Sequence, residues 1–209
     1  MSQSFSLEGI LCYARVCLFS RHLAIPHFSV FNLNDISPAS LTYFGFKGIV
    51  FDKDNTLTAP YINQVFPSLR DSLLHFKSIF GTRMAILSNS VGSSDDKDYI
   101  GAEEVEKEIG IKVLRHASKK PGCIDTVTDY FQCAPFELVS IGDRVFTDVV
   151  FGNMYGMLTF HTQALTEEGD NPIAKRLRKH ESRLVEKWRS RGIKAPPQKL
   201  LAGKEPIRF

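Results

Sequence analysis

The chain has 209 residues, of which 43% are hydrophobic, and this is enough for a single α/β domain with a well-filled core and short extensions. Its net charge of +3 gives no indication of nucleic-acid binding, and we expect no nucleic-acid partner. Four cysteines lack zinc-finger spacing and form no obvious disulfide framework: Cys12, Cys17, Cys123 and Cys133. They are more typical of packing residues in a reducing compartment.

The amino-terminal segment 1–34 is rich in Ser, Phe and Leu, and its one acidic residue, Glu8, is outnumbered by Arg15 and Arg21. This composition is typical of a targeting segment, although such segments usually hold more arginine. The apolar stretch 10–19 is too short to span a bilayer. It therefore predicts either an amphipathic helix at a membrane interface or a helix packed on the sheet.

Residues 47–51 are predicted to form a buried strand, because they include the short apolar run Gly-Ile-Val-Phe. Two carboxylates, Asp52 and Asp54, follow at its carboxyl end, which is where ligands bind in open α/β sheets. Like charges crowded there are costly unless a cation or a reaction uses them. Metal-assisted phosphoryl transfer would use one as nucleophile and the other as general acid/base. The alternative is a solvated Asp-rich turn.

The remaining elements alternate between helix and strand, which predicts an α/β fold with a doubly wound parallel sheet. Residues 67–80 show helical spacing of Leu69, Leu73, Phe76 and Phe80. Further helices are expected at 102–109, 123–131 and 147–154, and further strands at 84–88, 111–115, 137–141 and 157–161. The gaps 56–84 and 89–120 each hold too few elements for an inserted cap domain.

Further polar residues follow the later apolar runs. Ser88 and Asn89 end the second run, Lys119 and Lys120 precede a proline, and the third run ends in Gly-Asp at Asp143, with Asp148 five residues on. Singly, these are a strand-end serine, a surface lysine pair and turn aspartates. Together with Asp52 and Asp54 they form four polar segments in a fixed order, three of them at predicted strand ends. This arrangement favours a common site over coincidence.

The carboxyl-terminal region 172–194 holds nine basic residues against two acidic ones, Glu181 and Glu186. Ile173, Leu177, Leu184 and Trp188 recur at helical spacing. A basic amphipathic helix binds anionic lipid surfaces. The alternative is a solvated cationic face on a packing helix.

These segments together resemble the four motifs of the haloacid dehalogenase (HAD) superfamily of phosphatases. The longer stretches Phe-Asp-Lys-Asp-Asn-Thr, Ser-Asn-Ser-Val-Gly-Ser-Ser-Asp-Asp-Lys-Asp-Tyr, Arg-His-x-x-Lys-Lys-Pro-Gly-Cys and Gly-Asp-Arg-Val-Phe-Thr-Asp are more specific. They resemble the eukaryotic mitochondrial phosphatidylglycerophosphate phosphatase family over roughly residues 28–180.

The resemblance implies a role for each motif residue. Asp52 would attack phosphorus, Asp54 would protonate the leaving oxygen and then activate water, and Ser88 with neighbouring Asn89 would hold the phosphoryl group. Lys120, or else Lys119, would offset the negative charge.

The resemblance also implies a Mg²⁺ site. Its ligands would be Asp52, Asp143 and the backbone carbonyl of Asp54, with Asp148 orienting a metal-bound water or the lysine. Lys97, Arg115 and His116 are candidate contacts to a second phosphate of the substrate, or else ordinary loop charges.

The expected reaction is removal of the terminal phosphate of phosphatidylglycerophosphate through an aspartyl-phosphate, on the pathway to cardiolipin. The place would be the matrix side of the mitochondrial inner membrane, with peripheral contact to anionic lipid. The expected division is a targeting or interfacial segment at 1–34, the HAD-like domain at 35–170 and a basic helix and tail at 171–209. The rivals are a HAD phosphatase acting on a phosphoprotein or small soluble phosphoester, and a non-catalytic binding protein on the same scaffold.

Overall fold

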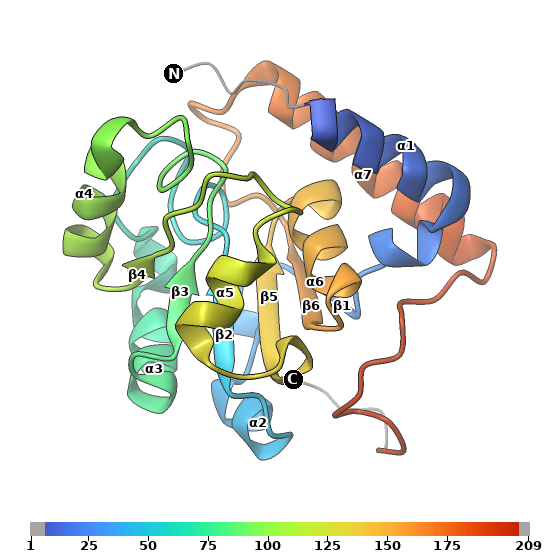
Figure 1. Ribbon diagram of the computed structural model, residues 1–209, viewed down its shortest axis with the longest axis horizontal. Coiled ribbons are helices and arrows are strands. Elements are labelled where there is room, and N and C mark those ends of the chain that lie inside the picture. Colours follow the sequence, from blue (N-terminus) through green and yellow to red (C-terminus); the bar gives the residue numbers. More distant parts are fainter. Residues whose placement is uncertain (1–6, 205–209) are drawn as a thin grey trace.

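The computed structural model describes residues 7–204, and its centre is one six-stranded parallel sheet with the strand order β1-β6-β5-β2-β3-β4 (Figure 1). The strands are β1 (Phe28–Val30), β2 (Gly48–Phe51), β3 (Met84–Ile86), β4 (Lys112–Val113), β5 (Leu138–Gly142) and β6 (Leu158–Thr162). The helices are α1 (Leu7–Phe19), α2 (Pro38–Tyr43), α3 (Arg70–Phe80), α4 (Ile100–Ile109), α5 (Ile124–Phe131), α6 (Val150–Met154) and α7 (Pro172–Ser190). The predicted α/β class with a doubly wound parallel sheet is confirmed.

Both faces of the sheet are covered, because alternate residues of each strand point to opposite sides. In β2, Ile49 and Phe51 belong to the core cluster that includes residues of α2, α3 and α4. Val50 belongs to a second cluster with residues of α5 and α6. A parallel strand buried on both faces is apolar throughout, which is why the run at 48–51 could be recognised in the sequence.

The order of the strands places a crevice at the carboxyl end of β2. From β2 the chain continues to β3 and β4 on one side, and then returns to β5 and β6 on the other. The sheet order therefore reverses between β2 and β5, and such a switch point is where open α/β sheets bind ligands. The connection from β2 to β3 holds α3 and that from β3 to β4 holds α4, so neither contains a separate cap domain.

Within residues 7–204, the strand β1 and the short helix α2 were not predicted. The three residues of β1 pair with β6, and the rings of Phe28 and Phe160 stack at 5.1 Å. A three-residue strand shows no periodicity, and its partner lies about 130 residues further along the chain. Ser37 caps the short α2, because its side chain accepts a hydrogen bond from the Ser40 N–H, and the helix begins at the proline that follows.

The helices α1 and α7 lie side by side at one end of the sheet (Figure 1). The Tyr13 hydroxyl is 3.0 Å from His180 Nε2, and Val16 packs in a cluster with Val185 and Trp188. The described part of the amino-terminal apolar stretch packs on α7 and not on the sheet. Its predicted placement at a membrane interface stays a prediction. The range 1–34 also contains β1, and its separation as a targeting or interfacial segment stays a prediction.

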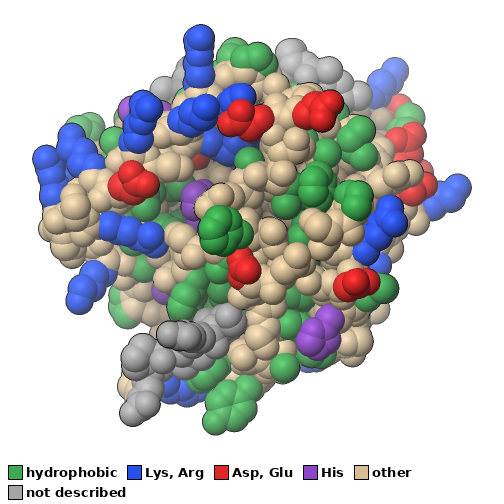
Figure 2. Space-filling view, turned by 180° about the vertical axis from the view of Figure 1, so that it is seen from behind, with side chains coloured by type: hydrophobic (Ala, Val, Ile, Leu, Met, Phe, Trp, Pro, Cys, Tyr) green, Lys and Arg blue, Asp and Glu red, His purple; other side chains and the backbone are tan. Residues whose placement is uncertain are grey.

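The basic residues predicted at 172–194 fall mostly within α7, and Lys and Arg side chains gather along it on the face shown in Figure 2. Within residues 7–204, none of the helices combines the length and the apolar character needed to cross a bilayer.

Candidate active site

The first two carboxylates follow the central strand directly. The Asp52 N–H donates to the Ile141 carbonyl of β5 at 2.8 Å, which extends the ladder by one residue and fixes Asp52 at the crevice. Beyond it the backbone turns, because the Lys53 carbonyl accepts hydrogen bonds from the N–H groups of Thr56, Leu57 and Thr58. This turn keeps the second carboxylate, Asp54, at the same end of the sheet.

Three donors hold the Asp54 carboxylate. Its Oδ1 accepts hydrogen bonds from Lys53 Nζ at 2.8 Å and from the Tyr61 N–H at 3.0 Å, and its Oδ2 accepts one from Ser90 Oγ at 3.1 Å. Lys53 is only 1% exposed, so its ammonium is committed to this contact. The sequence shows a lysine between the two aspartates, but its buried contact could not be inferred from the motif.

An acidic cluster forms where the ends of β2 and β5 meet. Asp52, Asp143 and Asp148 each bring one carboxylate oxygen to within 4.8 Å of the others. Asp143 follows β5, and Asp148 lies in the wide helical turn of residues 145–149 that precedes α6. A Cβ at Gly142 would overlap the Asp148 carboxylate, so the glycine is needed for this close approach.

Lys120 enters the cluster from the loop before α5. Its Nζ donates to Asp52 Oδ1 at 2.8 Å and contacts Asp148 Oδ1. Lys119 points elsewhere and pairs with Asp95 at 2.5 Å. The geometry therefore favours Lys120 of the two candidate lysines.

The pKa values reflect burial and crowding. Burial raises the pKa of Asp52 to about 7, with Lys120 opposing this rise and Asp148 adding to it. Burial, with Asp52 and Asp148, also raises the pKa of Asp143. Burial alone would lower the pKa of Lys120, but the carboxylates of Asp148 and Asp52 leave it raised.

The acidic cluster fits a divalent cation. Burial and the neighbouring carboxylates raise the pKa values of Asp52 and Asp143, and a bound cation would favour their ionised forms. A set of carboxylate oxygens from two neighbouring strand ends suits a hard cation such as Mg²⁺. The cluster is thus able to hold a metal ion, with Asp52, Asp143 and Asp148 as its acidic groups.

The residues after β3 connect the second and third motifs. Ser88 is buried at the crevice, and its Oγ lies 2.9 Å from Ser90 Oγ. Asn89 Oδ1 accepts a hydrogen bond from the Lys120 N–H at 2.9 Å. His116 is buried between two carbonyls, with Nε2 2.9 Å from Ser88 O and Nδ1 2.7 Å from Ser118 O. These contacts position Ser88 and Lys120 relative to each other.

Three predicted contacts do not line the crevice. Lys97 lies exposed near the start of α4. Arg115 pairs with Glu106 through both guanidinium Nη atoms, and His116 makes the backbone contacts given above. Their assignment to a second phosphate stays a prediction.

The helix α7 supplies residues that the motifs did not reveal. Arg178 Nη1 donates to Asp143 Oδ2 at 3.0 Å and also pairs with Asp170. Buried Glu181 accepts hydrogen bonds from Arg144 Nη2 at 2.8 Å and from the Val145 N–H at 2.9 Å. Helical periodicity predicted α7, but which side of it would face the crevice depends on the tertiary fold.

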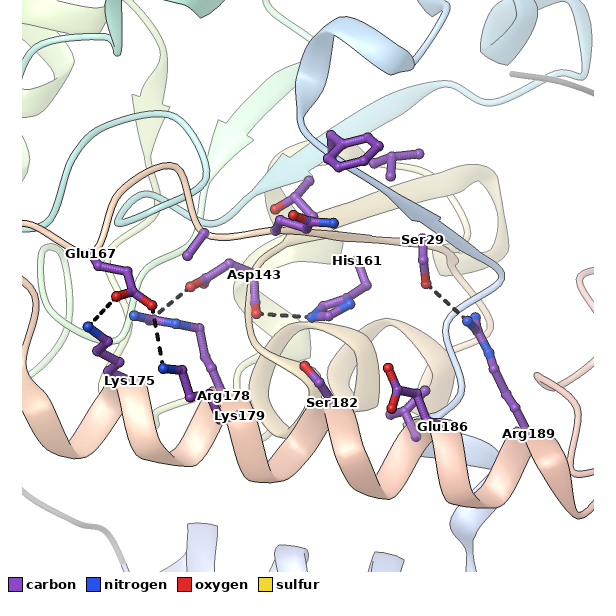
Figure 3. Close-up of a pocket in the computed structure, with 16 residues that line it drawn as sticks. Ser29, Asp143, His161, Glu167, Lys175, Arg178, Lys179, Ser182, Glu186 and Arg189 are labelled. Atoms are coloured by element: carbon purple, nitrogen blue, oxygen red, sulfur yellow. Dashed lines mark hydrogen bonds and ion pairs between the residues drawn. The ribbon is translucent and has the colours of Figure 1, made fainter.

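Two cavities meet at Asp143 and Arg178. The first, here called the reaction pocket, measures about 70 Å³, and its lining includes Asp52, Asp54 and Ser88. The second, here called the α7 groove, measures about 540 Å³ and lies between α7 and the strands β1 and β6 (Figure 3). In Figure 3, Arg178 reaches from α7 to Asp143, and Lys175 and Lys179 lie near Glu167.

The chain is similar to a family of known phosphatases. A family model described as mitochondrial PGP phosphatase, where PGP stands for phosphatidylglycerophosphate, matches residues 7–166. The phosphatidylglycerophosphate phosphatase 1, chloroplastic/mitochondrial, of Arabidopsis thaliana is 41% identical over 97% of this chain and 59% of its own length. The chloroplastic protein of the same name from Chlamydomonas reinhardtii is 37% identical over 96% of this chain and 75% of its own.

A fungal relative is matched over nearly its full length. The mitochondrial phosphatidylglycerophosphatase of Saccharomyces cerevisiae is 33% identical over 81% of this chain and 94% of its own length. By contrast, the chain spans only about three fifths of the Arabidopsis protein. No solved structure matches the chain.

Proposed function

Because this chain belongs to the mitochondrial PGP phosphatase family, we propose that it removes the terminal phosphate of phosphatidylglycerophosphate and leaves phosphatidylglycerol. One observation carries the proposal beyond family membership. Lys120 Nζ lies between Asp52 and Asp148, beside Asp143, at the switch point of the sheet. A buried lysine among three carboxylates suits phosphoryl transfer, in which charge stabilisation and positioning supply most of the catalysis.

In this proposal the residues of the chain divide the reaction between them. Asp52 attacks phosphorus and forms an aspartyl-phosphate, while Lys120 favours the ionised form of its carboxylate and balances charge on the phosphoryl oxygens. Asp54, held by its three donors, delivers a proton to the leaving glycerol oxygen and then takes one from the attacking water. Ser88 and Asn89 hold the phosphoryl group at the end of β3.

The proposed cofactor is Mg²⁺. Asp52, Asp143 and the backbone carbonyl of Asp54 would hold it, and Asp148 would act through Lys120 or a bound water. When bound, the ion neutralises negative charge on the phosphoryl oxygens. The fit rests on the carboxylate oxygens of the acidic cluster and on the raised pKa of Asp52 and Asp143.

The proposed place of action is the matrix side of the mitochondrial inner membrane, with peripheral contact to anionic lipid. The family description and the yeast relative name the mitochondrion, the Arabidopsis relative names both chloroplast and mitochondrion, and the Chlamydomonas relative names the chloroplast alone. On the surface, Leu11, Leu18 and Phe19 of α1 are 63%, 65% and 81% exposed. Arg15 lies among them, which gives an apolar stripe with a cation.

The direct test is phosphate release from vesicles that contain phosphatidylglycerophosphate. We expect turnover with Mg²⁺, loss of turnover on chelation and recovery when Mg²⁺ is restored. Full activity in excess chelator would remove the metal from the proposal.

The same assay separates the rival substrates. A phosphatase for phosphoproteins or small phosphoesters would prefer soluble phosphoesters to the lipid. A non-catalytic binding protein would release phosphate from neither.

A further inference from the structure

The size of the reaction pocket raises the question of where the rest of the substrate lies. Its volume of about 70 Å³ is far below the 540 Å³ of the α7 groove and below the roughly 300–1,000 Å³ of typical ligand sites. It is therefore a small space for a phosphorylated headgroup. If the proposed function holds, the substrate also carries a glycerol unit and a second, diester phosphate, which must lie outside this pocket.

The α7 groove is the neighbouring space. It shares Asp143 and Arg178 with the reaction pocket, and its volume of about 540 Å³ falls in the range of ligand sites. Arg178 is tied to Asp143 and Asp170, so it is charge-compensated and forms the wall between the two spaces. A substrate that passes this wall enters the groove beside the first turns of α7.

Two lysines converge at that point of the groove. Lys175 and Lys179 stand one helical turn apart, and both ammonium groups approach the carboxylate of Glu167, that of Lys179 at 3.6 Å (Figure 3). The Glu167 side chain is 61% exposed, and ion pairs that are open to solvent contribute little to stability. The two lysines therefore define an anion position whose present occupant is easily exchanged.

We propose that Lys175 and Lys179 bind the diester phosphate of the lipid headgroup, so that the α7 groove selects substrates carrying a second phosphate beyond the one removed. The diester displaces the Glu167 carboxylate and accepts charge-assisted hydrogen bonds from both ammonium groups. Phe31 and Val185 line the same groove and provide apolar surface for the glycerol carbons. This inference rests on the proposed function and identifies the part of the chain that recognises the substrate headgroup.

The test compares two soluble substrates, so that membrane binding does not enter. One is the deacylated headgroup, a glycerol–phosphodiester–glycerol phosphate, and the other is glycerol 3-phosphate, which lacks the diester. The measured quantity is the ratio of their kcat/KM values. In the double variant K175A/K179A we expect this ratio to fall by about tenfold or more, since charge-assisted hydrogen bonds to the diester are lost.

The matched control is the double variant R176A/R183A. It removes the same two positive charges from α7 at exposed positions that do not line the groove. We expect its ratio to equal that of the wild type. Equal ratios in all three proteins would overturn the inference, as would a selective fall of the ratio in K97A or R115A, because the diester would then bind on the other side of the crevice.

A failure of the proposed function would look different. The wild type would then hydrolyse glycerol 3-phosphate as well as the deacylated headgroup and would release no phosphate from lipid vesicles. A wild type that is active on the lipid but shows no effect of K175A/K179A would keep the function and discard only the subsite.

Discussion

The ionisation of Asp52 depends on two opposing effects, because burial favours the neutral carboxyl group while Lys120 favours the carboxylate. The change Asp52→Asn keeps the size of the side chain and removes the attacking oxygen charge. We expect phosphate release to fall by several orders of magnitude, comparable to the loss of a nucleophile in a catalytic triad. Ordinary turnover by a folded Asp52→Asn protein, with folding checked by circular dichroism, would rule out this nucleophile.

Gly142 tests how closely the acidic cluster must pack. Its substitution by alanine would push a methyl group into the Asp148 carboxylate. We expect Gly142→Ala to lower the free energy of unfolding by about 1–3 kcal/mol, as overpacking of a core does, and to reduce turnover as Asp148 moves away from Lys120. Denaturant unfolding measures the first effect. Gly122→Ala is the control, because a Cβ there meets neighbouring atoms at 3.5 Å, an ordinary contact.

At the scale of elements, α1 has two different sides. One side packs on α7 through Val16, while Leu11 and Leu18 face outward. Deleting residues 1–24 would also remove buried Ala24 and so would disturb the fold as well as any membrane contact. Substitutions at the exposed positions are therefore the cleaner probe of the membrane.

We expect the double variant L11S/L18S to sediment less with anionic vesicles than the wild type, because apolar side chains no longer enter the interface. Binding should also weaken in high salt, which screens the attraction to anionic lipid. Leu74→Ser is the matched control, since Leu74 on α3 is equally exposed, at 62%. If all three proteins sediment alike, the outer side of α1 is not the membrane contact.

At the scale of the whole molecule, the acidic cluster links stability to pH and metal. The pKa of Asp52 is raised from its ordinary value of 3.8 to about 7, so the folded protein holds a proton that the unfolded chain releases at lower pH. The resulting stabilisation is present below about pH 4 and is lost as pH rises through 7. Metal-free protein should therefore lose this contribution in neutral solution.

Mg²⁺ binds the ionised carboxylates, so its effect on stability should have the opposite pH dependence. We expect the rise in Tm on adding Mg²⁺ to be small at pH 5 and larger at pH 8. A Mg²⁺ concentration of 100 times its Kd raises the free energy of unfolding by about 2.7 kcal/mol. Thermal unfolding with Mg²⁺ and with chelator measures it, and Asp143→Asn should abolish most of the rise. A rise of the same size at both pH values would contradict this linkage.

The sequence by itself determined the fold class and the strand ends at which the candidate site residues lie. Buried parallel strands are apolar along their whole length, and the strands predicted at 47–51, 84–88 and 137–141 brought Asp52, Ser88 and Asp143 to the crevice. Local patterns were sufficient here, because the carboxyl ends of neighbouring parallel strands meet at one edge by necessity. The predicted helix at 67–80 was recognisable for the same reason, since its apolar face repeats within a few residues.

Only the tertiary structure decided which distant residues meet. Lys120 reaches Asp52 while its neighbour Lys119 turns away, and Arg178 reaches Asp143 from 35 residues further along the chain. The three-residue strand β1 gains its identity only by pairing with β6. These contacts depend on how helices and strands pack across the sheet. Local sequence patterns do not specify which segments that are far apart in sequence come into contact.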